Sequence, residues 1–255
     1  FRQAMRIMGH QFVMGRTIGE ALERAATGDD ARYRHTYDML GESALTAADA
    51  ERYMQSYRAA IVAVGASVRA GSAPASWPSI SVKLSALHAR YEFGKREQVL
   101  SELGARIEAL ALDARAAGIA LTIDAEEADR LELSLELLDR LLRQPGLAGW
   151  EGLGIAVQAY SKRAMDVLRY LGLRADETGR VLNVRLVKGA YWDSEVKRAQ
   201  ERGLPGYPVF TRKQNTDVSF LACARILLDG SRRIYPQFAT HNAHTVASII
   251  HLASV

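Results

Sequence analysis

Short apolar runs alternate with longer amphipathic stretches along most of the chain. The runs predict six strands, at residues 33–40, 79–84, 119–124, 153–158, 181–187 and 236–240. Between them, apolar residues at helical spacing predict helices at 46–70, 95–117, 126–143, 161–173, 193–202, 216–229 and 243–254. Near-continuous apolar strands that alternate with helices are typical of a parallel sheet covered by helices, an α/β fold.

Capping and breaking residues set the limits of several of these helices. Thr46 and Asp49 predict a helix start, because a hydroxyl and a carboxylate in the first turn satisfy free backbone N–H groups. Gly118 stops the helix before the third strand, and Pro145–Gly146 ends the helix before the fourth.

Polar side chains stand at the end of every predicted strand, and they favour a closed barrel over an open sheet. They are Asp38, Lys83, Asp124, Gln158, Arg185 with Lys188, and His241 with Asn242. In a (β/α)₈ barrel of the TIM type these ends converge on one mouth, whereas an open sheet concentrates function at one switch point. A length of 255 residues also suits one such barrel.

Composition and charge exclude several classes of protein. With 48% hydrophobic and 24% charged residues, the chain is an ordinary globular protein. Its one cysteine, Cys223, can form neither an internal disulfide nor a thiolate zinc site, which indicates a reducing compartment. The net charge is +4, but the basic residues are spread along the chain without interleaved aromatics. We therefore expect no nucleic-acid binding by this segment.

We expect neither a secretion signal nor a membrane-spanning run at the two ends of the given sequence. The first residues lack a charged start followed by an apolar stretch. The longest stretch without Asp, Glu, Lys or Arg covers residues 234–255, but it contains Pro236, Gln237 and three histidines. Because Phe1 is not a natural start residue, we expect the chain to be a piece of a longer protein.

Lys83 and Asp124 are candidate site residues on neighbouring strands. A lysine in a buried strand needs an anionic partner, or the pKa of its ammonium falls. Lys83 could therefore clamp an anion, form a Schiff base, or simply reach solvent. Asp124 could cap a helix or keep Lys83 charged. The acids that follow it, Glu126 and Glu127, are interpreted as first-turn residues that stabilise a helix dipole.

The segment Arg185–Trp192 combines two cations with a glycine at a strand end. Gly189 allows a close backbone approach and Lys188 neutralises phosphate, so the segment suits an anionic cofactor. Residues 207–213 add hydroxyl and basic groups that either face the same cofactor or form an ordinary surface loop. His241 and His244 lack the partners of a known metal motif, so no metal is expected.

Five motifs stand out along the chain: residues 37–42 (YDMLGE), 81–88 (SVKLSALH), 124–127 (DAEE), 185–195 (RLVKGAYWDSE) and 235–242 (YPQFATHN). These motifs resemble the proline dehydrogenase family, and most of all the proline dehydrogenase domain of the bifunctional bacterial PutA (proline utilization A) flavoenzymes. They follow the order of the family and cover nearly the whole chain.

The resemblance implies a distorted (β/α)₈ barrel that holds FAD at its mouth and oxidises L-proline to Δ1-pyrroline-5-carboxylate. In the family, hydride passes to flavin N5 and the electrons then pass to a membrane quinone. The resemblance further implies a covalently linked Δ1-pyrroline-5-carboxylate dehydrogenase in the parent protein. It implies a cytoplasmic location, with peripheral contact at the inner membrane, and is compatible with a homo-oligomer.

The resemblance also assigns roles to individual residues. Lys83 binds the proline carboxylate, Asp124 orients that charge, and Arg185 hydrogen-bonds the flavin near N5. The residues implied in cofactor binding are Ala125, Gln158, Arg185, Val187, Lys188, Gly189, Ala190, Trp192, Thr211, Lys213, Thr240, His241 and Asn242.

One departure from the family concerns the end of the chain. We expect residues 1–30 to be a helical segment before the barrel, and residues 31–255 to be a barrel without its last two strands and final helix. In the family that helix carries an arginine pair that completes carboxylate binding, and Glu42 pairs with one of these arginines. An open barrel leaves an exposed strand edge.

Two other functions remain open from the residues alone. Lys83 or Lys188 could form a Schiff base in a class I aldolase-like lyase with the same fold. Alternatively, the chain could be a non-catalytic fragment that serves as an interaction module.

Overall fold

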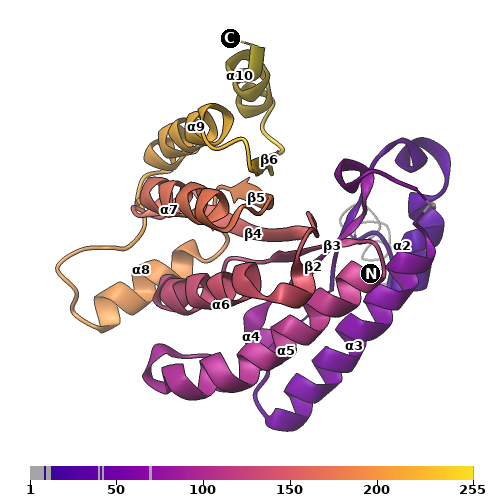
Figure 1. Cartoon of the computed structure of the whole chain (residues 1–255). Coiled ribbons are helices and arrows are strands. Elements are labelled where there is room, and N and C mark those ends of the chain that lie inside the picture. The colour runs from indigo at the N-terminus through magenta and orange to yellow at the C-terminus, as the bar shows by residue number, and fades with distance from the viewer. Residues whose placement is uncertain (1–8, 10–12, 40, 42, 69–70, 255) are drawn as a thin grey trace.

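Six parallel strands form one sheet in the order in which they occur along the chain (Figure 1). The computed structural model describes residues 9, 13–39, 41, 43–68 and 71–254. The strands are β1 (Thr36–Asp38), β2 (Ser79–Val82), β3 (Ala120–Ile123), β4 (Leu153–Gln158), β5 (Leu182–Val187) and β6 (Ile234–Phe238). Each pairs in parallel with the next, which confirms the predicted parallel α/β architecture.

Helices connect the strands and lie along the outside of the sheet (Figure 1). The helices are α2 (Ile18–Ala25), α3 (Ala47–Ala66), α4 (Leu84–Leu87), α5 (Arg96–Ala116), α6 (Leu131–Arg143), α7 (Ala164–Thr178), α8 (Trp192–Glu201), α9 (Lys213–Asp229) and α10 (Ala243–Ser254). The hydrophobic core fills the space between this helical layer and the sheet.

The alternation along β5 shows how the sheet separates core from site. Leu182, Val184 and Leu186 are fully buried, and the residues between them are partly exposed. Because successive side chains of a strand point to opposite faces, the second set, which includes Arg185, lies on the other face of the sheet.

The sheet is curved as the wall of a barrel is curved. Arg185 of β5 donates a hydrogen bond to the hydroxyl of Ser81 on β2 at 2.8 Å. A flat sheet would hold these two strands about 14 Å apart, three strand spacings, which is beyond the reach of an arginine. Among the described residues β1 and β6 do not pair with each other, so the barrel is not closed there.

Most predicted elements occur where the sequence indicates them. Strand 153–158 and helix 243–254 match β4 and α10, and the capping box of Thr46 and Asp49 begins α3. The first strand covers only residues 36–38 of the predicted 33–40, of which Leu40 lies outside the described residues.

Two local predictions are corrected. Helix α6 begins at Leu131, not at residue 126, and is preceded by a 3₁₀ turn at Ala128–Arg130. Glu126 lies outside the helix because its carboxylate bonds the backbone of Ser85, a contact that helical spacing cannot show. The short helix α4 was not predicted, because four residues are too few for a periodic pattern.

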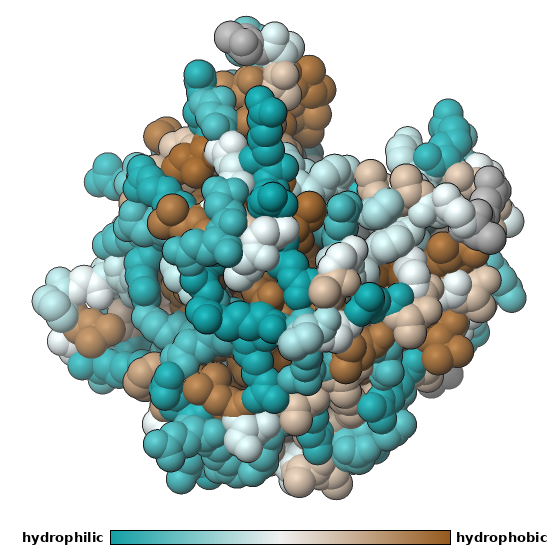
Figure 2. Space-filling model, in the orientation of Figure 1, coloured by the Kyte–Doolittle hydropathy of each residue, from teal (hydrophilic) through white to brown (hydrophobic). Residues whose placement is uncertain are grey.

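The surface carries some exposed apolar side chains but no membrane-spanning helix in the described part. Figure 2 shows apolar side chains gathered over α10, where Val246 and Ile250 are exposed. Every described helix is too short or too polar to cross a bilayer.

Candidate active site

The ammonium of Lys83 lies between two carboxylates at the ends of the first three strands. Its Nζ is 3.1 and 3.2 Å from the two carboxylate oxygens of Asp38, and 2.9 Å from Oδ2 of Asp124. The side chains of Lys83 and Asp124 are mostly buried, 16% and 15% exposed, whereas Asp38 is half exposed. The structure therefore brings the two predicted residues together and adds Asp38 to them.

These carboxylates determine the charge of Lys83. Burial alone would lower the pKa of its ammonium, but the charges and hydrogen bonds of Asp124 and Asp38 outweigh burial. The pKa of Lys83 is thereby raised above its ordinary value. Lys83 is accordingly a permanent cation at neutral pH.

Arg185 brings a second cation to the same place. Its Nη1 donates to Ser81 and lies 3.5 Å from Oδ1 of Asp124. Its Nη2 is buried and has no hydrogen-bond partner among the described residues. A buried guanidinium N–H without an acceptor is costly, so this nitrogen is suited to an acceptor from a ligand.

The backbone around Lys83 is held by two neighbouring elements. The N–H of Lys83 donates to the hydroxyl of Tyr57 on α3 at 3.1 Å, and the N–H of Ser85 donates to Oε1 of Glu126 at 2.9 Å. Burial raises the pKa of Tyr57 to about 12, so its hydroxyl keeps its proton at neutral pH.

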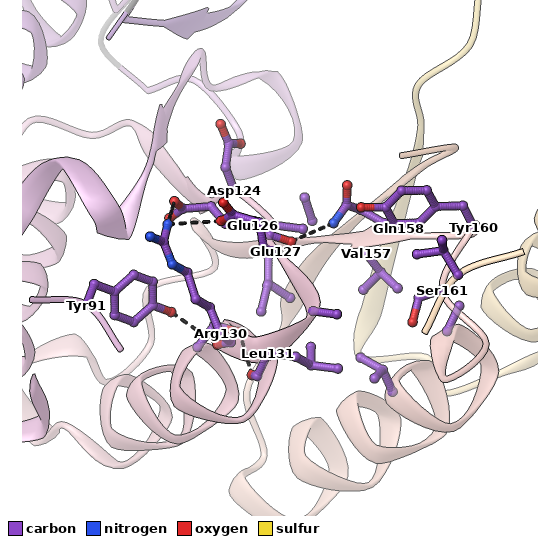
Figure 3. Close-up of a pocket in the computed structure, with 18 residues that line it drawn as sticks. Tyr91, Asp124, Glu126, Glu127, Arg130, Leu131, Val157, Gln158, Tyr160 and Ser161 are labelled. Carbon is purple, nitrogen blue, oxygen red and sulfur yellow. Dashed lines mark hydrogen bonds and ion pairs between the residues drawn. The ribbon is translucent and has the colours of Figure 1, made fainter. Parts of the chain in front are cut away.

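The loop after β3 carries a network of buried acids and arginines (Figure 3). Arg130 pairs with Glu126 at 2.8 Å and with Glu127 at 3.0 Å. Arg198 of α8 pairs with the second oxygen of Glu127 at 3.0 Å. Beside this loop is a cavity of about 40 Å³ between β4 and α6, large enough only for water.

Gln158 connects the ends of three strands. Its Nε2 donates to the carbonyl oxygen of Glu126 at 2.8 Å, and its Oε1 accepts from the N–H of Ala190 at 3.0 Å. The side-chain amide thus already has a protein partner at each end, and its second N–H and the second lone pair of Oε1 remain for a cofactor contact.

Lys188 and Lys213 meet at one carboxylate. The Nζ atoms of both lysines lie 2.6 Å from Asp217 of α9, one on each oxygen. Lys188 also donates to the hydroxyl of Thr245 at 3.3 Å and lies 5.9 Å from the ring centre of Phe220. Two cations share one anion, which leaves a positive excess at this place.

Position 189 requires a glycine. Its φ of +141° is a conformation that other residues rarely adopt. A Cβ atom at this position would lie 2.5 Å from the ring of Tyr160. The chain therefore passes directly over this ring just after β5.

The other predicted cofactor residues lie at the strand ends or in the loops beyond them. Trp192 begins α8 and donates its indole N–H to the carbonyl oxygen of Phe210 at 3.0 Å. Asn242 caps α10 by accepting from the N–H of Thr245 at 3.0 Å. The remaining ones are Ala125 after β3, Val187 at the end of β5, the exposed Thr211, and Thr240 and His241 after β6. Glu42 lies outside the described residues.

Sequence reasoning missed the contributions of three residues, Asp38, Ser81 and Tyr57. Asp38 ends a predicted strand, and this signal marked it as polar and chemically capable. Its pairing with Lys83 depends on β1 lying beside β2 in register, with Asp38 opposite Ser81. Tyr57 is one of the buried residues of α3, and its helical spacing gives no sign that its hydroxyl contacts the backbone of Lys83. Among the described residues, no group of three or more His, Cys, Asp or Glu side chains could hold a metal ion.

Comparisons with known proteins agree with this arrangement. The family model described as proline dehydrogenase matches residues 21–255. The chain is 57% identical over 250 residues to the bifunctional protein PutA of Salmonella typhimurium, covering 98% of this chain and 19% of that protein. It is 27% identical over 244 residues to proline dehydrogenase 1 of Bacillus subtilis, covering 95% of this chain and 68% of that protein.

A solved structure shows the same fold. The chain superposes on the crystal structure of Bradyrhizobium japonicum proline utilization A (PutA) mutant D779W with a TM-score of 0.90 and 53% identity. The match covers 100% of this chain and 26% of that chain. It supports the predicted TIM-like barrel architecture. The chain spans about one fifth of the length of the PutA relatives it matches.

Proposed function

Because the chain belongs to the proline dehydrogenase family, whose members are flavoenzymes, we propose that it carries an active site for the oxidation of L-proline to Δ1-pyrroline-5-carboxylate, with FAD as the flavin. The observation that carries this proposal is the Lys83 ammonium between two carboxylates, with the Arg185 guanidinium beside it. This cluster offers a charge clamp for a zwitterionic substrate next to a preorganised cation.

Lys83 is suited to bind the carboxylate of the substrate. An ammonium has three N–H donors, and Nζ of Lys83 lies within hydrogen-bond distance of both oxygens of Asp38 and of one oxygen of Asp124. We assign one donor to Asp124 and one to Asp38, whose two oxygens share it, so that the third donor would bind one carboxylate oxygen of proline. Asp124 holds Lys83 and Arg185 at a fixed separation because its two oxygens face one cation each.

The residues at the mouth fit a flavin on two grounds. Arg185 has a buried Nη2 without an acceptor among the described residues, and a flavin ring atom could provide one. The positive excess at Lys188 and Lys213 suits the diphosphate of FAD, which would compete with Asp217 for them. When bound, the flavin supplies the redox chemistry by accepting a hydride. Arg185 would then favour negative charge on the reduced ring.

The backbone after β5 would provide the rest of the cradle. Gly189 leaves the chain without a side chain where it passes over Tyr160, so backbone N–H groups can approach a ligand closely. The contacts that we assign to the cofactor beyond these are Ala125, Gln158, Val187, Ala190, Trp192, Thr211, Thr240, His241 and Asn242.

The alternative function, an aldolase-like lyase, is less well supported by this site. A Schiff base needs a neutral amine, whereas Asp38 and Asp124 raise the pKa of Lys83 and keep it charged. Lys188 forms an ion pair with Asp217 at 2.6 Å.

Further expectations about the parent protein are part of the proposal. We propose that electrons leave to a membrane quinone and that the product passes to a linked Δ1-pyrroline-5-carboxylate dehydrogenase. The support is the bifunctional name of the PutA relatives, of which this chain spans only a part. We also propose a cytoplasmic protein, homo-oligomeric and in peripheral contact with the inner membrane, in which residues 1–30 precede the barrel and Glu42 completes the substrate site.

The proposed function is tested by mixing the flavin-loaded protein with proline under anaerobic conditions. We expect the absorbance at 450 nm to disappear and Δ1-pyrroline-5-carboxylate to accumulate in equal amount. Absence of both changes in a protein that retains its flavin would refute the proposal. Borohydride trapping of a carbonyl substrate on Lys83 would favour the lyase instead.

The Lys83→Ala variant tests the clamp separately. We expect KM for proline to rise by about 10- to 100-fold with a smaller change in kcat, since the charge contact exists before and during the reaction. The control is Lys197→Ala, which removes an exposed lysine paired with Glu201 on α8. Equal proline kinetics in Lys83→Ala and in the control would contradict the assignment.

A further inference from the structure

Glu126 is a buried acid that the proposed chemistry does not use. Its side chain is 3% exposed, and its two oxygens face different elements. Oε1 accepts from the N–H of Ser85, and Oε2 pairs with Arg130. The interpretation of Glu126 as an acid in the first turn of the helix that follows it is therefore wrong, because α6 begins only at Leu131.

Glu126 caps the helix that follows Lys83. Lys83 is the N-cap residue of α4, and its side chain makes no capping hydrogen bond. An ammonium has no acceptor atom, so a lysine at this place leaves the first N–H groups of the helix without a cap. Glu126 supplies the acceptor from the neighbouring strand end, and this leaves the side chain of Lys83 to Asp38 and Asp124.

The same residue lies two positions after Asp124. Glu126 thus connects the chain two residues beyond Lys83 with the chain two residues beyond Asp124. The separation of the two charged groups of the clamp depends on the relative position of these two segments. A fixed hydrogen bond between them therefore fixes the geometry of the clamp.

Hydrogen bonds extend this connection on both sides. Towards β1, the N–H groups of Ser43 and Ala44 donate to the hydroxyl and carbonyl oxygens of Ser85 at 3.1 and 2.9 Å. Towards β5, Gln158 bonds the carbonyl of Glu126 and the N–H of Ala190. We call this series the mouth belt; it consists of Ser43, Ala44, Ser85, Glu126, Gln158 and Ala190.

The mouth belt joins the ends of five strands, and Glu126 is its only acidic member; burial raises the pKa of its carboxyl. We propose that Glu126 is a positioning residue that holds Lys83 and Asp124 in register for substrate binding by capping α4 from the neighbouring strand. Glu126 touches neither substrate nor cofactor and acts through the backbone of Ser85. This inference rests on the proposed function, because the clamp it positions is the one assigned to proline.

The test compares Glu126→Leu with Glu126→Gln in the flavin-loaded protein. Leucine has a similar volume but no acceptor, and we expect KM for proline to rise by about 10-fold while kcat changes by less than about 3-fold. Glutamine keeps an oxygen for the N–H of Ser85, and we expect its KM to stay within about 3-fold of wild type.

Glu195 offers a matched control because it contacts the same loop after β3 from α8. It is a buried glutamate of α8 that accepts a backbone N–H, that of Ala128, at 2.6 Å, but it makes no bond to α4. Glu195→Leu therefore loosens the loop after β3 without uncapping α4. We expect this variant to lose thermal stability while its KM remains that of wild type.

Amide hydrogen exchange provides a measurement that does not depend on activity. We expect exchange across residues 84–87 to be at least 10-fold faster in Glu126→Leu than in wild type, and unchanged in Glu126→Gln and in Glu195→Leu. Faster exchange together with the raised KM supports the inference.

Two outcomes would overturn the inference while the proposed function stands. One is wild-type KM in Glu126→Leu, in a protein whose wild type oxidises proline. The other is an equal rise of KM in Glu195→Leu, which would mean that any loosening of this loop has the same effect. Failure of the wild type itself to oxidise proline would refute the proposed function instead.

Discussion

The chemistry of Lys83 is decided by residues that are distant from it in the sequence. Asp38 and Asp124 lie 45 and 41 positions away, yet both reach its ammonium. They keep it charged and occupy two of its donors, so that it can bind a carboxylate but is a poor nucleophile. Arg185, 104 positions from Ser81, is brought to the same cluster by the curvature of the sheet.

At this scale the sharpest prediction concerns Arg185. We expect Arg185→Met to lower turnover of proline by about 100-fold, because a cation that stabilises developing negative charge is lost. The midpoint potential of the bound flavin should fall as well, because the reduced ring loses its cationic partner. Potentiometric titration and steady-state kinetics measure the two effects.

Arg169→Met is a suitable control, since Arg169 forms an exposed ion pair with Asp166 on α7. We expect it to leave both quantities unchanged. If Arg185→Met keeps the wild-type potential and turnover, Arg185 does not act on the flavin.

At the scale of elements, the strands define the fold and their ends define the site. Short segments at the ends of the strands from β2 to β5 hold one polar group each: Lys83, Asp124, Gln158, which is the last residue of β4, and Lys188. These segments are not free loops. The mouth belt joins them by hydrogen bonds, so that the site is built on rigid elements.

The turn after β5 is the element most sensitive to substitution. We expect Gly189→Ala to destabilise the protein by roughly 2–4 kcal/mol, because alanine at a positive φ is strained and its Cβ would collide with the ring of Tyr160. Urea denaturation measures this loss.

Gly203→Ala separates the two causes. Gly203 also has a positive φ, +60°, but no atom lies within 4 Å of the place of its Cβ. We expect a loss of only about 1 kcal/mol there, from backbone strain alone. Equal losses in the two variants would show that Tyr160 yields to the added methyl group.

For the molecule as a whole, the site lies at one end of a curved sheet whose two edge strands are β1 and β6. The interior strands β3 and β4 pair on both sides, whereas β1 and β6 pair on one side only within the described residues. We therefore expect stability to be lower at the edge strand β6, which the proposed cofactor residues Thr240, His241 and Asn242 follow, than in the middle of the sheet.

We expect removal of the flavin to lower the stability of the entire fold. A ligand present at about 100 times its Kd stabilises the folded state by about 2.7 kcal/mol. For a chain of this size we expect the flavin-free protein to melt about 5–10 °C lower. Differential scanning calorimetry measures the shift, and amide exchange should increase most at residues 188–190 and 240–242. An identical Tm with and without flavin would contradict the proposed cradle.

The elements and the identity of the main charged residues can be predicted from the sequence alone. Apolar runs and helical spacing are local properties, and they correctly predict a parallel α/β sheet with β4 and α10 at their observed limits. Lys83, Asp124 and Arg185 were identifiable because each places a charge at the end of an apolar strand. The motifs around them indicated the family.

How these residues work together depends on contacts between elements that are distant in the sequence. The second carboxylate on Lys83, the hydroxyl of Ser81 on Arg185 and the shared Asp217 all depend on register and curvature, which bring distant positions within 3 Å or little more. Glu126 is the clearest case. Its place after a strand predicts an acid that stabilises the dipole of the following helix. Instead, its carboxylate accepts the uncapped N–H of Ser85 in α4, and this buried hydrogen bond outweighs the preference for the first turn of a helix.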